Sequence, residues 1–170
     1  MHKKITIVTT YAADTRIIAN QGIIPWNSHK NDLRLKALIE KGVCIMGPEM
    51  FSSIYDKLAK CQVVVVSETA DPRNYPDGVQ IVATLGEAIK KTSHKNIFLL
   101  GGVCIFQEGL EYADTISATI IDYSGPGDRF FPHLGSEWTS NHEVTKDEFR
   151  EDSNGNMIAF VNFKKNPVFV

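Results

Sequence analysis

Cysteine is scarce in this chain of 170 residues. Only Cys44, Cys61 and Cys104 are present, and none of them belongs to a CxxC pair or lies near a histidine in the sequence. Zinc sites and disulfide frameworks depend on such spacing, so neither is indicated and no metal is expected. The odd number of cysteines and the polar start of the chain favour a reducing compartment, and we expect a cytoplasmic protein.

Positive charge and long apolar runs are also lacking. The 18 basic residues do not exceed the 20 acidic ones, and the net charge of −2 provides no broad basic surface for duplex nucleic acid or anionic lipid. No apolar run approaches the roughly 20 residues of a membrane span, and no signal peptide is visible. We therefore expect a monomer whose partner is a small-molecule substrate, with neither nucleic acid nor a membrane.

Apolar residues make up 43% of the chain, enough for one compact domain over residues 1–170. Short β-branched runs predict strands at 5–8, 43–46, 62–66, 79–82, 96–100 and 116–121. An Asn-Gly turn signal predicts a final hairpin from 143–149 and 157–163. Apolar spacing and capping signals predict helices at 32–41, 48–55, 84–91 and 103–112. This alternation predicts an α/β fold, with a mainly parallel eight-stranded central sheet, an antiparallel C-terminal hairpin and about four flanking helices.

Asp32 is the first candidate for a functional side chain. On its predicted helix it shares a face with Leu35 and Ile39, so the carboxylate lies beside an apolar stripe. Removing an unpaired carboxylate from water is costly, and a ligand that presents two N–H donors would offset that cost. Acidic residues also favour the first helical turn because of the helix dipole, so a structural role stays open.

Three other segments point to a bound ligand. Residues 17–26 form an apolar loop that ends in Pro25-Trp26, which is typical of a loop that closes over a ligand, although Trp26 could instead pack in the core. Gly47 and the pair Gly101-Gly102 each follow a strand and precede a helix. Two such junctions in one sheet suit the pyrophosphate of a dinucleotide, because backbone N–H groups are free at a helix N-terminus.

These features recur as an ordered set of motifs. The set is Ile-Ile-Ala-Asn-Gln-Gly-Ile-Ile-Pro-Trp (17–26), Asn-Asp-Leu (31–33), Ile-Met-Gly (45–47), Phe-Ser-Ser-Ile (51–54), Leu-Leu-Gly-Gly (99–102) and Gly-Asp-Arg-Phe-Phe-Pro (127–132). Their order and approximate spacing resemble the dihydrofolate reductase family over residues 5–132. The resemblance implies an oxidoreductase that uses NADPH to reduce the pterin ring of 7,8-dihydrofolate, in the tetrahydrofolate biosynthesis that supports one-carbon metabolism.

The resemblance also implies roles for individual residues. At the reacting ring it implies Asp32 as the acid that anchors and polarises the pterin, Thr119 as a threonine hydrogen-bonded near that acid, and Trp26 as a tryptophan that orders a water. The implied walls of the substrate pocket are Leu33, Leu35, Ile54, Leu58, Leu100 and Phe106. The implied cofactor contacts are Ile18, Ala19, Asn20, Gly47, Pro48, Glu49, Met50, Ser67, Glu68, Gly101, Gly102, Val103, Cys104 and Ile105.

Two departures from the family's pattern concern its ligands. Glu49 and Glu68 stand where the family usually carries groups for the 2′-phosphate of NADPH, which predicts a weakened preference for NADPH, with NADH usable. The alternative is that both carboxylates point to solvent and another group, such as Arg73, compensates. Cys61, next to Lys60, stands where the family places an arginine for the glutamate tail of folate. This predicts weaker folate binding or a substrate without that tail.

A third departure lies in the helix that carries Asp32. The helix reads as one residue short, and Lys36 stands where an apolar or aromatic residue is usual, which predicts a thinner wall of the ring pocket. Two further interpretations stay open. The chain could reduce another pterin- or pyrimidine-like ring that lacks a glutamate tail, or it could be a non-catalytic relative that binds nucleotide without turnover.

Overall fold

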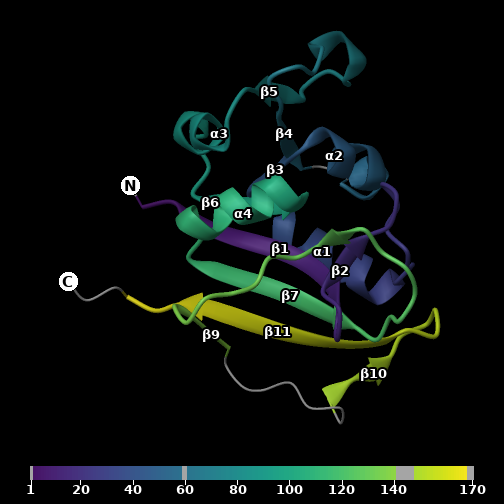
Figure 1. Ribbon diagram of the computed structural model, residues 1–170. Helices are drawn as coiled ribbons and strands as arrows, with labels where there is room; N and C mark the ends of the chain where they lie inside the picture. Colours follow the sequence, from purple (N-terminus) through teal and green to yellow (C-terminus); the bar gives the residue numbers. More distant parts are fainter. Residues whose placement is uncertain (1, 59–60, 141–147, 168–170) are drawn as a thin grey trace.

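The computed structural model describes residues 2–58, 61–140 and 148–167 (Figure 1). Its helices are α1 (His29–Ile39), α2 (Pro48–Ile54), α3 (Leu85–Lys91) and α4 (Val103–Tyr112), with short 3-10 turns η1 (Tyr55–Lys57) and η2 (Pro72–Asn74). Its strands are β1 (Lys4–Ala12), β2 (Ile17–Ala19), β3 (Val43–Met46), β4 (Gln62–Val66), β5 (Gln80–Val82), β6 (Asn96–Gly101), β7 (Thr115–Ile121), β8 (Arg129–Phe130), β9 (Trp138–Ser140), β10 (Arg150–Glu151) and β11 (Met157–Lys165).

The main sheet has the order β10-β11-β7-β1-β6-β3-β4-β5, and β9 pairs with β11 (Figure 1). The pairs that involve β1, β3, β4, β5 and β6 are parallel, including the pair of β1 with β7. Strand β11 is antiparallel to β7, β9 and β10. The predicted α/β fold, with a mainly parallel sheet, antiparallel C-terminal strands and four helices, is confirmed.

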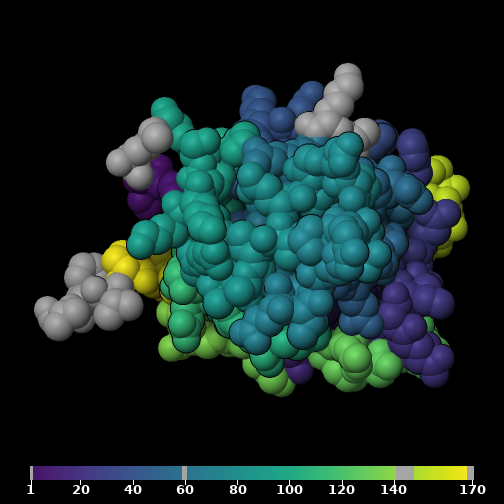
Figure 2. Space-filling model, turned by 90° about the horizontal axis from the view of Figure 1, so that it is seen from above, coloured from purple at the N-terminus to yellow at the C-terminus, as the bar shows by residue number. Residues whose placement is uncertain are grey.

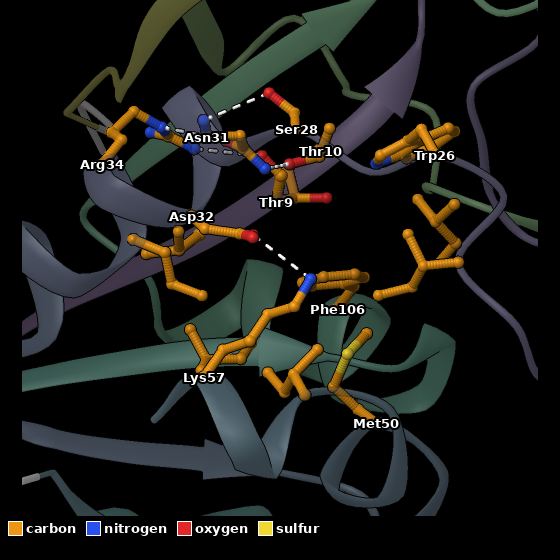
Figure 3. Close-up of a pocket in the computed structure, with 16 residues that line it drawn as sticks. Thr9, Thr10, Trp26, Ser28, Asn31, Asp32, Arg34, Met50, Lys57 and Phe106 are labelled. Atoms are coloured by element: carbon orange, nitrogen blue, oxygen red, sulfur yellow. Dashed lines mark hydrogen bonds and ion pairs between the residues drawn. The ribbon is translucent and has the colours of Figure 1, made fainter. Parts of the chain in front are cut away.

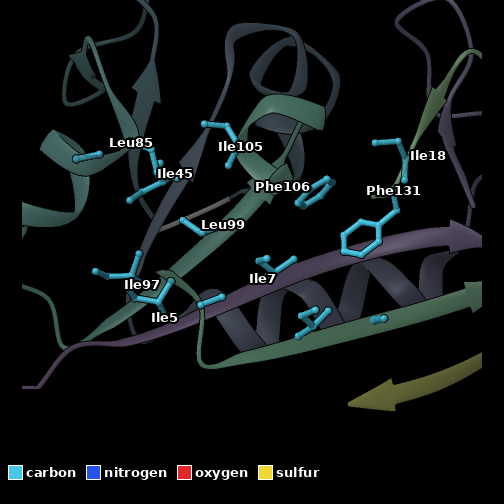
Figure 4. Close-up of a cluster of buried hydrophobic side chains, with 14 of the residues drawn as sticks. Ile5, Ile7, Ile18, Ile45, Leu85, Ile97, Leu99, Ile105, Phe106 and Phe131 are labelled. Atoms are coloured by element: carbon cyan, nitrogen blue, oxygen red, sulfur yellow. The ribbon is translucent and has the colours of Figure 1, made fainter. Parts of the chain in front are cut away.

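Alternation along the strands divides the core into two layers. Val43 and Ile45 of β3 belong to a cluster that includes α3 and α4, whereas Cys44 and Met46 belong to a cluster that includes α1 and α2. Successive side chains of a strand point to opposite faces, so an almost continuously apolar strand must be covered on both sides. Figure 4 shows the first cluster between α4 and the sheet. The layered arrangement leaves the strand ends and the helix starts free to form a site.

The structure corrects several details of the predicted elements. Residues 17–19, expected in a loop, form β2, which pairs with β8 in a small separate sheet. The main sheet therefore has nine strands in the described part of the chain, where eight were predicted. Helix α1 begins at His29 rather than residue 32, because the side chain of Ser28 accepts a hydrogen bond from the Asn31 N–H and caps it. Most of the predicted strand 143–149 lies outside the described residues.

The segment that contains β5 and α3 covers the end of the molecule seen from above in Figure 2. Thr84 caps α3 by accepting from the Glu87 N–H at 3.1 Å, as its capping signal predicts.

Within the described ranges, none of the helices has the length and apolar character needed to cross a membrane.

Candidate active site

A cleft of about 690 Å³, open to solvent, lies between α1, β1 and the segments that follow β2, β3 and β6 (Figure 3). Its lining residues are Val8, Thr9, Thr10, Ile18, Ile24, Trp26, Ser28, Asn31, Asp32, Arg34, Leu35, Met50, Ile54, Lys57, Leu100 and Phe106. An apolar lining with a few convergent polar groups is typical of small-molecule sites. This cleft is called the ring pocket below.

One wall of the ring pocket is a chain of hydrogen bonds that starts at Thr119. The Thr119 hydroxyl, which is completely buried, donates to Asn31 Oδ1 at 2.7 Å, and Asn31 Nδ2 donates to the Thr10 hydroxyl at 2.8 Å. Thr119, predicted to be hydrogen-bonded near Asp32, therefore bonds to the residue before it and not to Asp32 itself. The reason is helical geometry: neighbouring residues on α1 point about 100° apart, so Asn31 and Asp32 cannot both face Thr119.

Asp32 lines the ring pocket and is paired with a cation. Its Oδ1 lies 3.3 Å from Lys57 Nζ, which reaches across the cleft from η1 (Figure 3). The Asp32 and Lys57 side chains are 26% and 38% exposed, so water screens the pair and its strength is that of a surface ion pair, about 0–1 kcal/mol. Such a pair can open at little cost when a ligand arrives.

Arg34 is the half-buried cation of this wall. Its guanidinium donates to the Ser117 hydroxyl at 2.6 Å, and it makes longer contacts to the Thr9 carbonyl at 3.4 Å and Asn31 Oδ1 at 3.5 Å. Burial lowers the pKa of Arg34 to about 10, since the charged form loses its hydration. The side chain stays charged at neutral pH and places positive potential behind the Asn31 amide.

The predicted substrate walls divide into two groups. Leu35, Ile54, Leu100 and Phe106 line the ring pocket. The other two predicted wall residues, Leu33 and Leu58, do not line the cleft. Leu33 is 52% exposed, and Leu58 packs in the core cluster that includes α1 and α2. Lys36 is exposed, and Leu35 supplies the aliphatic wall in its place. Leu33 points away because it lies one residue beyond Asp32 on α1.

Sequence reasoning missed several residues of the cleft. They are Val8, Thr9, Thr10, Ser28, Asn31, Arg34 and Lys57, together with Ile24, which was singled out only as part of the loop 17–26. The sequence did not indicate the two threonines on β1, because a polar residue on a strand is expected to face solvent unless the position of the neighbouring helix is known. Asn31 could have been found, since it precedes Asp32 and sits one helical turn before Leu35.

The C-terminal hairpin holds the start of α1. Burial raises the pKa of Asp152, but hydrogen bonds from the Ser28 hydroxyl and from the amides of Asn156 and Asn154 outweigh it and hold the pKa at about 2. The Asn154 side chain also accepts from the His29 N–H at 2.8 Å. The hairpin therefore fixes the turn of α1 from which Asn31 and Asp32 enter the cleft.

The predicted nucleotide-binding glycines lie together. The Gly47 N–H donates to the Gly101 carbonyl at 2.8 Å, which joins the start of α2 to the turn before α4. Gly101 has φ +114°, and a Cβ there would lie 2.9 Å from Phe106, whereas a Cβ on Gly102 would meet nothing within 4 Å. Open space in front of a ten-residue helix whose N-cap has no side-chain bond fits a phosphate. Val103, Cys104 and Ile105 form the first turn of that helix.

The two predicted carboxylates of the cofactor site are exposed. Glu49 lies in the first turn of α2, and Glu68 follows Ser67, whose hydroxyl accepts from the N–H groups of Thr69 and Ala70 at 3.2 and 3.0 Å. Arg73 is bound through its guanidinium to Asp71, with a closest contact of 2.8 Å. To contact a 2′-phosphate, Arg73 would have to release Asp71.

The loop after β2 lies against α2. Asn20 and Ile23 pair across a tight turn, and the Ser53 hydroxyl donates to the Gly22 carbonyl at 3.2 Å. Ile18 is buried and lines the ring pocket, while Ala19 and Asn20 are half-buried. Trp26 is also half-buried in the pocket wall, with an edge contact to Tyr123 at 5.4 Å, so it is not a core residue.

Two of the three cysteines, one on β3 and the other just before β4, are neighbours. Cys44 Sγ lies 2.6 Å from Cys61 Sγ, although the sequence spacing gave no sign of a pair. The hydrogen bond to Cys61 and burial raise the pKa of Cys44, and the same bond lowers the pKa of Cys61 against its partial burial. Cys61 also takes no part in the ring pocket. Lys60 lies outside the described residues.

Comparison with known proteins agrees with this geometry. A family model described as dihydrofolate reductase matches residues 4–165. The chain is 29% identical over 137 residues to the dihydrofolate reductase of Bacillus subtilis, covering 78% of this chain and 80% of the relative. It is 30% identical over 118 residues to that of Staphylococcus aureus, covering 69% and 71%, and 28% identical over 155 residues to dihydrofolate reductase type 3 of Salmonella typhimurium, covering 90% and 93%. The chain therefore belongs to the dihydrofolate reductase family.

Proposed function

We propose that this protein reduces 7,8-dihydrofolate to tetrahydrofolate with NADPH. Its family is one of NADPH-dependent oxidoreductases. The observation that carries the proposal is the junction of two sites: Leu100 and Phe106 flank the Gly101-Gly102 turn and also line the ring pocket. A nucleotide held at the turn would therefore place its reactive end beside a ring in the pocket.

The residues present fit a dinucleotide at its pyrophosphate. Gly102 and the first turn of α4 would hold one phosphate, and Gly47, tied to Gly101, would approach the other. Ile18 and Phe106 offer apolar surface at the end of the ring pocket nearest to this turn. When bound, the reduced nicotinamide supplies the hydride for C6 of the pterin, and solvent supplies the proton for N5.

The chain contributes binding, orientation and exclusion of water. Leu35, Ile54 and Met50 form apolar walls against which a flat ring can pack, and the segment that carries Ile24 and Trp26 covers the pocket from one side. Holding two rings in contact lowers the barrier by up to about 7–11 kcal/mol. Asp32, the one acidic residue among the described residues that line the pocket, places a negative charge in the wall that can polarise a bound ring without contacting it.

A reductase of a tail-less pterin is the second candidate. Cys61 stands before β4 where an arginine for the glutamate tail was expected, and its sulfur is engaged with Cys44 and the Gly42 carbonyl. Lys57, a cation of the same segment, is paired with Asp32. A lysine holds a carboxylate less specifically than an arginine.

The test is a spectrophotometric assay that follows loss of reduced nicotinamide with dihydrofolate and with a dihydropterin without a glutamate tail. We expect turnover of dihydrofolate, and we expect a kcat/KM ratio of NADPH to NADH below about 100, because Glu49 and Glu68 repel a 2′-phosphate. Turnover of the tail-less substrate alone would favour the second candidate. Stoichiometric nucleotide binding without any turnover would refute both.

Two variants test the expected kcat/KM ratio of NADPH to NADH. Glu49→Gln and Glu68→Gln should each raise the NADPH-to-NADH ratio several-fold, about the effect of removing one nearby negative charge. Glu108→Gln, on the exposed part of α4, is the control and should leave the ratio unchanged. A ratio above about 100 in the unmodified protein would defeat the expectation.

A further inference from the structure

Of the polar residues that α1 sends into the ring pocket, Asn31 and Asp32 differ in the hydrogen bonds that they can still make. Asn31 is held at both ends of its amide, by Thr119 at Oδ1 and by Thr10 at Nδ2. One N–H of Nδ2 and one lone pair of Oδ1 remain, the latter touched only by the long 3.5 Å contact from Arg34. Because Thr119 donates to Oδ1 and Thr10 accepts from Nδ2, these two bonds fix the orientation of the amide, with its acceptor on one side and its donor on the other.

We propose that Asn31, rather than Asp32, contacts the ring of the substrate. This inference rests on the proposed function and names the residue that reads the ring. The Asn31 amide offers one donor and one acceptor side by side. It therefore selects a neutral ring edge that also carries an adjacent donor and acceptor, such as N–H next to C=O, or an amino group next to a ring nitrogen.

The alternative, contact through Asp32, would select a different ligand. A carboxylate offers two acceptors and a negative charge, which suits a ring edge with two N–H donors, best of all a protonated one. Asp32 already has a cationic partner in Lys57, which lies 3.3 Å away across the cleft. The contact of Asn31 with a cation is the longer one, 3.5 Å from Arg34 Nε to Oδ1, and its amide is uncharged at every pH where the protein is folded.

The other charges near Asn31 also oppose a cationic ring. The half-buried Arg34 places Nε 3.5 Å from Asn31 Oδ1, and Lys57 reaches into the same cleft. Asp32 is the one opposing charge among the described residues that line the pocket. Two cations against one anion give a pocket that disfavours a positively charged heterocycle.

A second, independent observation places a ligand on the same wall. Thr9 is 5% exposed, lines the ring pocket, and its hydroxyl has no hydrogen-bond partner among the described residues (Figure 3). A buried hydroxyl without a partner is costly, and a ligand that hydrogen-bonds to it would remove that cost. We assign the Thr9 hydroxyl as the second contact to the ring, beside the Asn31 amide.

The experiment measures equilibrium binding, so it does not require turnover. The probe is a 2,4-diamino-5-benzylpyrimidine, which below its ring pKa presents two N–H donors and a positive charge. Its dissociation constant is measured by titration calorimetry at about pH 6 and about pH 9 for the unmodified protein, Asn31→Asp, Asp32→Asn and Asn74→Asp. Asn74 is exposed in η2, so its variant is the matched control for an added carboxylate.

We expect Asn31→Asp to bind the protonated probe about tenfold or more tightly than the unmodified protein, because a charge-assisted pair replaces a neutral one. Arg34 favours the charged form of the new carboxylate. The gain should shrink at the higher pH as the probe loses its proton, and Asn74→Asp should stay within about twofold. A gain within about twofold for Asn31→Asp, together with a loss of about tenfold for Asp32→Asn, would return the ring contact to Asp32.

Thr9→Val provides a test that does not depend on the new carboxylate. Because it removes an unpartnered buried hydroxyl at nearly constant shape, it should raise the melting temperature of the free protein and weaken folate binding by about three- to tenfold. Unchanged folate binding would overturn the Thr9 contact. Failure of the unmodified protein to reduce dihydrofolate, with the expected probe results, would refute the proposed function and leave the Asn31 assignment standing.

Discussion

Replacing Gly101 with alanine tests the packing of the glycine turn, and Gly102→Ala is its built-in control. The backbone at Gly101 has φ +114°, a conformation that residues with a Cβ adopt at a cost of about 1–3 kcal/mol. The added Cβ would also lie 2.9 Å from Phe106 Cζ and 3.0 Å from Met50 Cε. Overpacking of this kind costs a further 1–3 kcal/mol or so.

We expect Gly101→Ala to lose about 3 kcal/mol of unfolding free energy, which for a protein of this size lowers the melting temperature by about 6–12 °C. Gly102→Ala should change the melting temperature of the free protein little, because its φ is −74° and its Cβ would meet nothing within 4 Å. The same Cβ would project into the space assigned to the pyrophosphate, so NADPH binding should weaken about tenfold or more.

Thermal unfolding followed by circular dichroism, with and without NADPH, separates the two effects. We expect opposite patterns: a lower melting temperature of the free protein for Gly101→Ala, and a smaller NADPH-induced rise in melting temperature for Gly102→Ala. Equal melting temperatures for Gly101→Ala and the unmodified protein would refute the packing argument. An undiminished NADPH-induced rise in the melting temperature of Gly102→Ala would refute the phosphate assignment.

Two further predictions concern groups whose pKa the structure shifts. Asp152→Asn should destabilise the protein by about 1–2 kcal/mol at neutral pH in urea unfolding, since it weakens the bonds from Ser28 and the hairpin amides. Because the folded pKa of about 2 lies below the unfolded value, this difference should vanish as pH falls from about 4 to about 2, and a pH-independent difference would contradict the account. Cys44→Ala should slow alkylation of Cys61 by iodoacetamide near neutral pH, because losing the bond from Cys44 raises the pKa of Cys61. Exposed Cys104 provides the internal control, and an unchanged Cys61 rate would show that the bond does not form.

Local chemistry was enough to predict the layered architecture. Runs such as Gln62–Val66 are apolar on both strand faces and therefore predict a buried parallel strand, and Thr84 and Pro48 mark helix starts through hydrogen bonding and a fixed φ. The glycine junctions at Gly47 and Gly101 were also predictable, because a strand that ends in glycine before a helix is a local pattern.

Which side chains share a wall was decided only by the tertiary structure. The sequence determined that a polar pair, Asn31 and Asp32, opens α1, but the direction of each side chain depends on how the hairpin at Asp152 holds the helix start. Thr119 and Lys57 lie 88 and 25 residues from their partners on α1, and no local spacing encodes such contacts. A pattern of 3.6 residues fixes which residues share a face of a helix, whereas the packing of that helix against the sheet decides which of them meets the substrate.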